Sequence, residues 1–255
     1  MNPPNQARQA PARATRGFTM IELLVALTIG LALMIVVAQL FLGSRATYAT
    51  TDDLSRMQEN IRFSHTLLAR TVHLAGYRTA PNSLVGNVFA GANAALAATN
   101  GAGTASDTLT VRYQGHNDAG GAADGSVLDC LGNRVAANAM AVNTFSIAPG
   151  ANGNNALFCN GVELVADVRN MQIVFGEDTN ADLTADRYVA LPDVANMNNV
   201  VSVRIALLYE TPGPAAAATM DTKTYNLHGV VVGPFNDLRI RRVVTTTYNL
   251  RNRTP

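Results

Sequence analysis

The fold is decided by the stretch Arg16-Gly17-Phe18-Thr19-Met20-Ile21-Glu22-Leu23-Leu24-Val25, which opens an apolar run that continues to Leu42. From Phe18 to Leu42 the only ionisable side chain is that of Glu22. As a helix this run is roughly 37 Å long, and the hydrocarbon core of a bilayer is about 30 Å thick. The run therefore predicts a transmembrane helix. A carboxylate costs about 2–3 kcal/mol at mid-bilayer, so Glu22 indicates a function.

The block Gly17-Phe18-Thr19-Met20-Ile21-Glu22-Leu23-Leu24 resembles the class III signal of type IV pilins and type II secretion pseudopilins. The resemblance implies that a prepilin peptidase cuts after Gly17 and methylates the new N-terminal residue, Phe18. It also implies that Glu22 assists methylation and pairs with the terminal amine of a neighbouring subunit. This pairing agrees with physical chemistry, because a buried charge is tolerable when an opposite charge meets it.

Three further segments resemble the PilW family of minor pilins, which is akin to the J-type pseudopilin of type II secretion. They are residues 60–78, 175–189 and 241–253. Major pilins often carry a proline that kinks the membrane helix, and none lies between Phe18 and Leu42. The resemblance therefore favours a minor subunit of a pilus, a filament used in adhesion and twitching motility. It implies contacts with other minor and major pilins through the N-terminal helix, with the prepilin peptidase and with the inner-membrane assembly platform.

Composition limits the remaining possibilities. The 255 residues are 48% hydrophobic and 15% charged, enough for one sizeable globular domain beside the membrane segment. The net charge is only +1, and three cations precede the apolar run, which argues against nucleic acid as a partner. Two C-terminal arginine clusters are interpreted as the solvated outer face and the end of a strand: Arg239, Arg241 and Arg242, then Arg251 and Arg253.

Charge also predicts the orientation in the membrane. Arg8, Arg13 and Arg16 precede the span without any acidic residue, so the positive-inside rule places the N-terminus in the cytoplasm. The bulk of the chain is then expected in the periplasm, anchored in inner-membrane lipid by a single pass, and later in an extracellular pilus. The alternative is a secretory signal cleaved after Ala38.

Four segments are expected. Residues 1–17 form a basic leader removed by the peptidase, 18–42 a transmembrane or filament-core helix, 43–76 its amphipathic continuation, and 77–255 a periplasmic β-rich domain. No proline lies between Pro11 and Pro81, which predicts one helix from about Phe18 to about Ala75, with Gly76 as its C-cap.

The amphipathic half of this helix carries two apolar stripes. One consists of Leu54, Met57, Ile61, Leu68, Val72 and Ala75, and the other, nearly opposite, of Phe63, Leu67 and Leu74. The first stripe is expected to pack on the chain's own sheet. The second faces other subunits on one hypothesis, whereas on the other both stripes are covered by the same domain.

Short β-type runs follow without helical periodicity between them. They lie at residues 107–113, 162–175, 201–207 and 238–250, whereas residues 82–107 are rich in Ala, Gly and Asn and indicate a long loop. The pattern predicts an antiparallel sheet and an α+β fold like that of type IV pilins, with a long N-terminal helix packed on a C-terminal sheet domain. The fold of residues 82–160 is left open.

The two cysteines, Cys130 and Cys159, are expected to form one disulfide in an oxidising periplasm. A loop of about 30 residues would then contribute about 3–4 kcal/mol in the chain-entropy estimate. A zinc site is disfavoured because two Cys without a nearby His form an incomplete ligand set.

One constellation suits a hard cation such as calcium: Asp178, Asn180, Asp182 and Asp186. Leu183 replaces the glycine of an EF-hand loop, and Val189 stands where a bidentate Glu would close the site. A solvated turn linking two strands is therefore the competing interpretation, and a structural calcium ion is the one cofactor considered.

Catalytic motifs give no support for an enzyme. The four His residues form no H-E-x-x-H pair, and the sequence has neither G-x-S-x-G nor a P-loop. We therefore expect a structural minor pilin for pilus assembly or priming. The alternatives are a minor pseudopilin of the J type and, from another class, a signal-anchored periplasmic enzyme or binding module.

Overall fold

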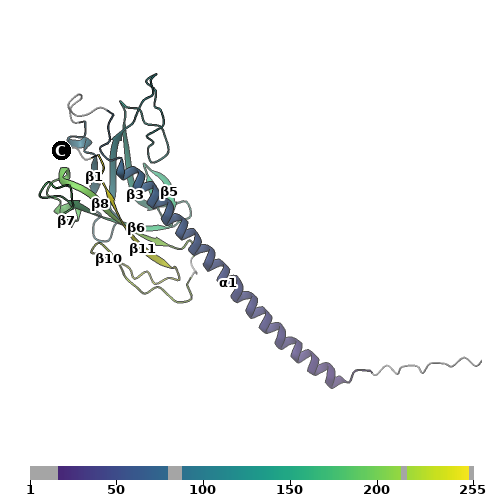
Figure 1. Cartoon of the computed structure of the whole chain (residues 1–255). Coiled ribbons are helices and arrows are strands. Elements are labelled where there is room, and N and C mark those ends of the chain that lie inside the picture. Colours follow the sequence, from purple (N-terminus) through teal and green to yellow (C-terminus); the bar gives the residue numbers. More distant parts are fainter. Residues whose placement is uncertain (1–16, 80–87, 214–216, 253–255) are drawn as a thin grey trace, which may run out of the picture. The chain divides into compact units, whose positions relative to one another are not determined.

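The computed structural model describes residues 17–79, 88–213 and 217–252. The chain forms two compact units, Met1–Tyr48 and Ala49–Pro255. Nearly all of the predicted leader, residues 1–16, lies outside the described residues. The secondary structure consists of one long helix followed by antiparallel strands, so the predicted α+β class is confirmed (Figure 1).

Helix α1 runs from Met20 to His73, close to the predicted range. Among the described residues, α1 is the one helix that is long and apolar enough to cross a membrane. The end of the helix is as predicted from sequence, because Gly76 has a φ of +74° in the left-handed region that glycine tolerates best. The Gly76 amide donates a 2.9 Å hydrogen bond to the Arg112 carbonyl, which connects the helix end to a strand.

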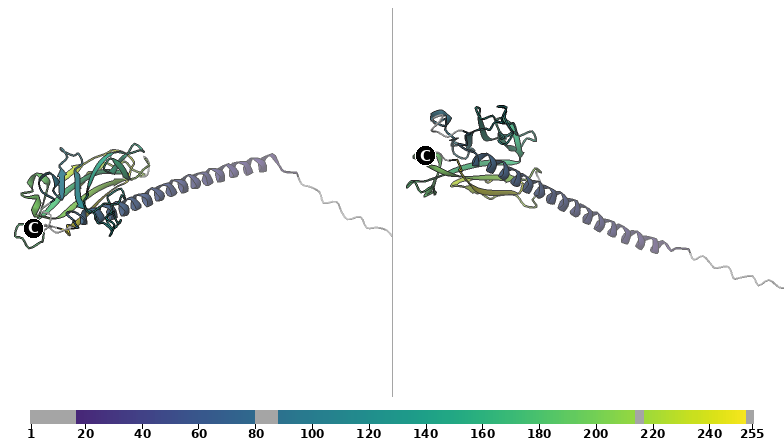
Figure 2. Two further views of the ribbon diagram at one scale, coloured as in Figure 1. Left: turned by 90° about the horizontal axis from the view of Figure 1, so that it is seen from above. Right: turned by 45° about the horizontal axis from the view of Figure 1, so that its top comes forward.

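Two antiparallel sheets and a hairpin build the second unit (Figure 2). The five-stranded sheet follows the chain in order as β1 (Leu96–Thr99), β2 (Thr108–Gln114), β3 (Met140–Pro149), β4 (Asn155–Cys159) and β5 (Val162–Ala166). The four-stranded sheet has the order β11-β8-β6-β7, from β6 (Val168–Glu177), β7 (Arg187–Val189), β8 (Val200–Glu210) and β11 (Arg241–Asn249). The hairpin is β9 (Tyr225–Leu227) with β10 (Val230–Val232).

Three short 3-10 turns lie among the described residues. η1 (Gly91–Asn93) precedes β1, and η2 (Leu191–Asp193) and η3 (Met197–Asn199) lie between β7 and β8. The expectation of a long loop over residues 82–107 is wrong in part, because β1 pairs with β2 over four residues. Residues 80–87 lie outside the described part of the chain. The alternation that marks the other strands is weak in Leu96-Ala97-Ala98-Thr99, and pairing with β2 decides its structure.

The main core lies where the C-terminal half of α1 meets both sheets. Met57, Leu68 and Val72 of α1 are almost fully buried there. The four-stranded sheet supplies Val203, Ile205, Leu207 and Tyr209, and the five-stranded sheet supplies Leu109, Val111 and Phe145. The first predicted stripe therefore packs on the chain's own domain, as expected.

The second stripe is divided. Leu67 is 7% exposed and belongs to the main core, and Leu74 packs against it, whereas Phe63 is 54% exposed. The hypothesis that this whole stripe faces other subunits is therefore wrong for Leu67 and Leu74.

Polar contacts hold α1 to strands far away in the sequence. Ser64 shares a short hydrogen bond with the Tyr209 hydroxyl, and the side-chain Nδ2 of Asn60 donates to the Ala166 carbonyl at 3.0 Å. His73 Nδ1 lies 2.8 Å from the Asn249 carbonyl oxygen. These buried or half-buried groups are satisfied by one another, so they fix the rotation of the helix on the sheets.

A disulfide joins Cys130 and Cys159, the pair expected from sequence. It ties the excursion between β2 and β3 to the end of β4. The Cys130 amide also donates to the Asn143 side chain at 2.7 Å. Arg70 of α1 donates to the Asp129 carbonyl at 2.9 Å, so this excursion is linked to the helix as well.

The expectation of a solvated arginine face is wrong for Arg241 and Arg239. The Arg241 side chain is only 2% exposed and lies 2.8 Å from Glu210, 3.1 Å from Asp221 and 2.6 Å from Asp237; that of Arg239 is 17% exposed. The Phe235 ring lies 4.0 Å from the Arg241 guanidinium. Arg242 and Arg251 are exposed, and Arg253 lies outside the described residues.

Candidate functional site at the start of the helix

The first described residues, Gly17, Phe18 and Thr19, precede α1 in non-helical conformation. Phe18 is 91% exposed, and a Cβ added to Gly17 would meet no atom within 4 Å. No described residue therefore covers the bond between Gly17 and Phe18. A processing enzyme can bind a peptide bond outside a helix more easily, because its backbone groups are not engaged in helical hydrogen bonds.

Thr19 and Glu22 form reciprocal hydrogen bonds at the helix start. The Glu22 Oε2 atom accepts from the Thr19 amide at 2.9 Å and from the Thr19 hydroxyl at 2.8 Å. The Glu22 amide in turn donates to the Thr19 Oγ1 atom at 3.3 Å. This is a capping box, in which a Thr and a Glu three residues apart satisfy amides that the first turn leaves unpaired.

The sequence pattern predicted Gly17, Phe18 and Glu22, and the structure adds Thr19. The Thr-x-x-Glu spacing is present in the sequence and could have predicted the capping box. The resemblance to pilins, however, implied a role for the Glu22 carboxylate and none for Thr19. The hydrogen bonds of the Glu22 carboxylate within the described residues all use Oε2. Its second oxygen, Oε1, is thus available to a donor from outside the described residues.

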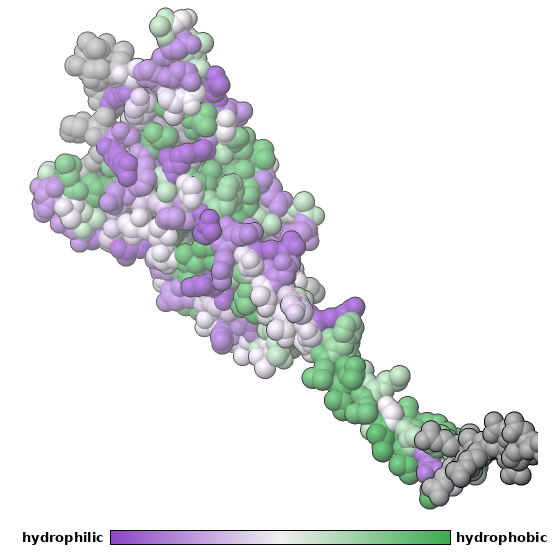
Figure 3. All heavy atoms as spheres, turned by 45° about the vertical axis from the view of Figure 1, so that its right-hand side comes forward, coloured by the Kyte–Doolittle hydropathy of each residue, from purple (hydrophilic) through white to green (hydrophobic). Residues whose placement is uncertain are grey.

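Beyond this site the N-terminal part of α1 presents apolar side chains all round. The large ones between Leu23 and Leu42 are at least 52% exposed, and Figure 3 shows a mainly apolar surface along this part of the helix. A helix that is apolar on every side needs lipid or protein around it. The apolar helix and the motif at its start are those of a membrane-anchored chain.

The four residues of the calcium hypothesis lie in the loop between β6 and β7. Asp178 Oδ1 accepts from the Ala181 amide at 2.6 Å, and Asp178 Oδ2 accepts from the Leu183 amide at 2.9 Å. The side-chain Nδ2 of Asn180 donates to Asp182 Oδ2 at 3.2 Å and to Asp186 Oδ1 at 3.4 Å. These contacts describe a hydrogen-bonded turn.

A buried carboxylate, which was not predicted from the sequence, joins the two ends of this loop. Glu177, 1% exposed, accepts from Arg187 at 2.7 Å and from the amides of Ala195 and Asn196. Burial raises the pKa of Glu177, but the hydrogen bonds outweigh it and leave the pKa below its ordinary value. The charged form therefore holds the loop ends together at neutral pH.

Calcium binding by the loop stays a prediction. No group of three or more His, Cys, Asp or Glu suited to a metal ion was found in the described part of the chain. If calcium binds, isothermal calorimetry of the full chain with calcium should give heat that Asp182→Asn weakens and that Asp118→Asn, in another loop, leaves unchanged. Absence of heat at millimolar calcium would remove the hypothesis and leave the turn.

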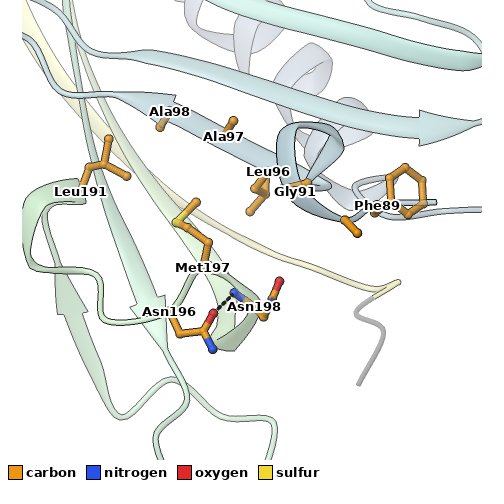
Figure 4. A pocket seen from close by; sticks show the side chains of 11 residues that line it. Phe89, Gly91, Leu96, Ala97, Ala98, Leu191, Asn196, Met197 and Asn198 are labelled. Carbon is orange, nitrogen blue, oxygen red and sulfur yellow. Dashed lines mark hydrogen bonds between the residues drawn. The ribbon is translucent and has the colours of Figure 1, made fainter. Parts of the chain in front are cut away.

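A separate pocket of 480 Å³ lies between the η1–β1 segment and the η2–η3 segment (Figure 4). Phe89, Leu96, Leu191 and Met197 give it an apolar lining, and the Asn196 side chain accepts from the Asn198 amide at its rim. Among the described residues, none of those that line this pocket has a titratable side chain, so none of them could serve as a general acid or a general base.

Comparisons with known proteins agree with this geometry. Residues 12–38 match the model of the prokaryotic N-terminal methylation motif, and residues 135–252 match that of the type IV pilus-assembly protein W, PilW. No curated protein matches the chain. Among solved structures, the type IV-like pilin TTHA1219 from Thermus thermophilus is similar, with 14% identity and a TM-score of 0.46 over 78% of this chain and 98% of that chain. The chain thus combines the N-terminal methylation motif with a PilW domain, and together the two matches support its assignment to the PilW-type type IV pilins.

Proposed function

We propose that this chain is a structural minor pilin that takes part in the assembly or priming of a type IV pilus. The observation that carries the proposal is the capping box of Thr19 and Glu22, which stands directly after the open Gly17–Phe18 bond and inside the methylation motif. In this proposal a prepilin peptidase removes residues 1–17, and Phe18 becomes the methylated N-terminus. The chain works by assembly rather than by catalysis.

The membrane-anchored state is the first stage of this function. The apolar run crosses the inner membrane once, with the Arg-rich N-terminus in the cytoplasm and the second unit in the periplasm. After processing, the same helix packs in the apolar core of the filament, where the helices of neighbouring subunits replace lipid. Since its side chains are exposed all round, it can be surrounded by either environment.

Glu22 connects these two stages. Before assembly, Thr19 supplies hydrogen bonds that make the carboxylate less costly to hold near the apolar phase. During assembly, its second oxygen accepts from the Phe18 amine of a neighbouring subunit, and the opposite charges set the register between helices. The partners in this step are other minor and major pilins, delivered by the inner-membrane assembly platform.

A minor pseudopilin of a type II secretion system is the second candidate. It would use the same leader, methylated terminus and Glu22 contact, and it would differ in the subunits with which it assembles. Co-purification from membranes separates the two candidates, because the pilus proposal requires pilins among the co-assembled subunits and the alternative requires pseudopilins.

Mass spectrometry of the mature N-terminus tests the proposal. The expected product begins at Phe18 and carries one methyl group, because the peptidase cuts after Gly17 and methylates the amine it releases. Chain from cells that lack the peptidase is the control and should retain the leader. A product that begins at Gln39 would instead indicate an ordinary secretory signal, and either that product or an unprocessed chain would contradict the proposal.

A further inference from the structure

The end of the apolar run carries a single cation. Arg45 is the only charged residue between Glu22 and Asp52, and it follows the last residues of the run, Leu42, Gly43 and Ser44. No salt bridge to Arg45 occurs among the described residues, whereas Arg56 further along pairs with Asp52 at 2.9 Å. Within the described part of the chain, Arg45 is thus the one charge that marks the far end of the span, and it has no anion of its own there.

The Arg45 side chain folds back over the preceding helical turn. Its guanidinium lies 4.4 Å from the centroid of the Phe41 ring. A cation–π contact uses the flat face of the guanidinium and leaves the N–H groups at its edge free. Tyr48, 75% exposed, lies on the same side of the helix, because positions i, i+4 and i+7 share one face.

The spacing along the helix matches a bilayer. Glu22 and Phe41, whose ring contacts the Arg45 guanidinium, are separated by about 29 Å along the helix axis. The hydrocarbon core of a bilayer is about 30 Å thick. When Glu22 lies at one boundary, the guanidinium therefore reaches the opposite one, where phosphate groups are found and where Tyr side chains concentrate.

From these observations we propose that Phe41, Arg45 and Tyr48 form a phosphate-binding belt that docks on phospholipid headgroups of the outer leaflet and sets the depth of the subunit. This rests on the proposed membrane insertion and adds a specific lipid contact to it. Charge complementarity identifies the occupant, because a guanidinium with free edge donors binds phosphate through two parallel hydrogen bonds. In this belt Phe41 lies on the hydrocarbon side of the contact between Arg45 and phosphate, and Tyr48 lies on its water side.

The belt has a consequence for the position of the helix. Without Arg45 the uncharged run would extend to Thr51, so the helix could slide by about 10 Å before Asp52 met the hydrocarbon. Arg45 opposes this sliding. Leaving the membrane for a filament then requires that the guanidinium exchange its phosphate for another partner.

Accessibility of residue 44 tests the inference. The full chain with Ser44→Cys is reconstituted in vesicles of phosphatidylethanolamine and phosphatidylglycerol and treated with a membrane-impermeant maleimide. The introduced thiol is the only one that reacts, because Cys130 and Cys159 are joined. Each rate is divided by the rate of the same variant in urea, so that the effect of Arg45 on the reactivity of the thiol cancels.

Arg45→Ala is expected to lower the normalised rate about fivefold, the equivalent of about 1 kcal/mol for one cation at a lipid surface. Arg45→Lys should keep most of the rate, and Arg56→Ala, the matched control beyond the interface, should leave it unchanged. In galactolipid vesicles, which carry no phosphate, the chain with Arg45 should react as slowly as Arg45→Ala does.

Equal normalised rates for the chain with Arg45 and for the Arg45→Ala variant would overturn the belt. An unchanged rate in galactolipid vesicles would do so as well, because the position would then not depend on phosphate. Flotation of the vesicles separates this failure from that of the proposed function. A chain that does not float with vesicles in any variant contradicts the membrane insertion itself, and the belt with it.

Discussion

Replacing Arg241 with Ala is expected to lower the free energy of unfolding by about 3–5 kcal/mol, the cost of removing one partner from a buried ion cluster. The side chains of Arg241 and Glu210 are 2% and 3% exposed, and that of Asp221 is 7% exposed. Without the guanidinium, Asp221 remains buried and has no cation paired with it among the described residues, and Glu210 keeps only its 3.9 Å contact with Arg239. The change should appear in the thermal melting of the full chain in detergent, followed by the circular dichroism of the β domain.

The matched control is Arg242→Ala, the adjacent arginine on the exposed side of β11. It removes the same charge from solvent and should change the stability by less than about 0.5 kcal/mol. Equal changes in the free energy of unfolding for the two substitutions would contradict a stabilising role of the buried cluster. The two variants have the same amino-acid composition, so only the position of the lost arginine differs between them.

Acid titration gives a second measure of the same cluster. A hydrogen bond from the Arg241 side chain holds the pKa of Asp237 below its ordinary value of 3.8. A carboxyl whose pKa is lowered by folding stabilises the fold above the unfolded pKa, and this contribution is lost as the pH falls through the folded pKa. Arg241→Ala should therefore make the stability less dependent on pH below 4, in addition to lowering it at pH 7.

Glu22→Gln is expected to leave membrane insertion intact and to reduce incorporation into filaments roughly a hundredfold, the equivalent of about 3 kcal/mol. Gln can still accept from Thr19, because a capping box works with either residue at this position. What is lost is the negative charge that would meet a neighbouring Phe18 amine. The amount of the chain in sheared pili, relative to that in membranes, measures the effect.

Thr28→Val is the matched control for this prediction. The Thr28 hydroxyl donates to the Val25 carbonyl within its own helix, so its removal takes away a polar group without touching a charge. Normal incorporation is expected for this variant. If Glu22→Gln were also incorporated normally, the assembly role of the carboxylate would be lost, even if the N-terminus were processed as proposed.

The sequence by itself determined the helix, its membrane length and the motif at its start. Each of these depends on residues close together in the chain: an apolar run, the absence of proline up to Pro81, and a glycine at the helix end. The capping box belongs to the same group, because Thr19 and Glu22 are three residues apart. The strands with clear alternation, such as β2 and β8, were predictable for the same reason.

Only the tertiary structure decided which side chains of these elements are buried. Arg239, Arg241 and Arg242 suggested a solvated strand face. In the structure the segment around Phe235 and the β9–β10 hairpin cover the outer side of β8. Arg241 meets two carboxylates from distant positions, Glu210 and Asp221, besides that of nearby Asp237. Leu67 and Leu74 became core residues because two sheets, rather than one, enclose the helix. These outcomes depend on contacts between residues far apart in the chain, and periodicity carries information only about a residue's near neighbours.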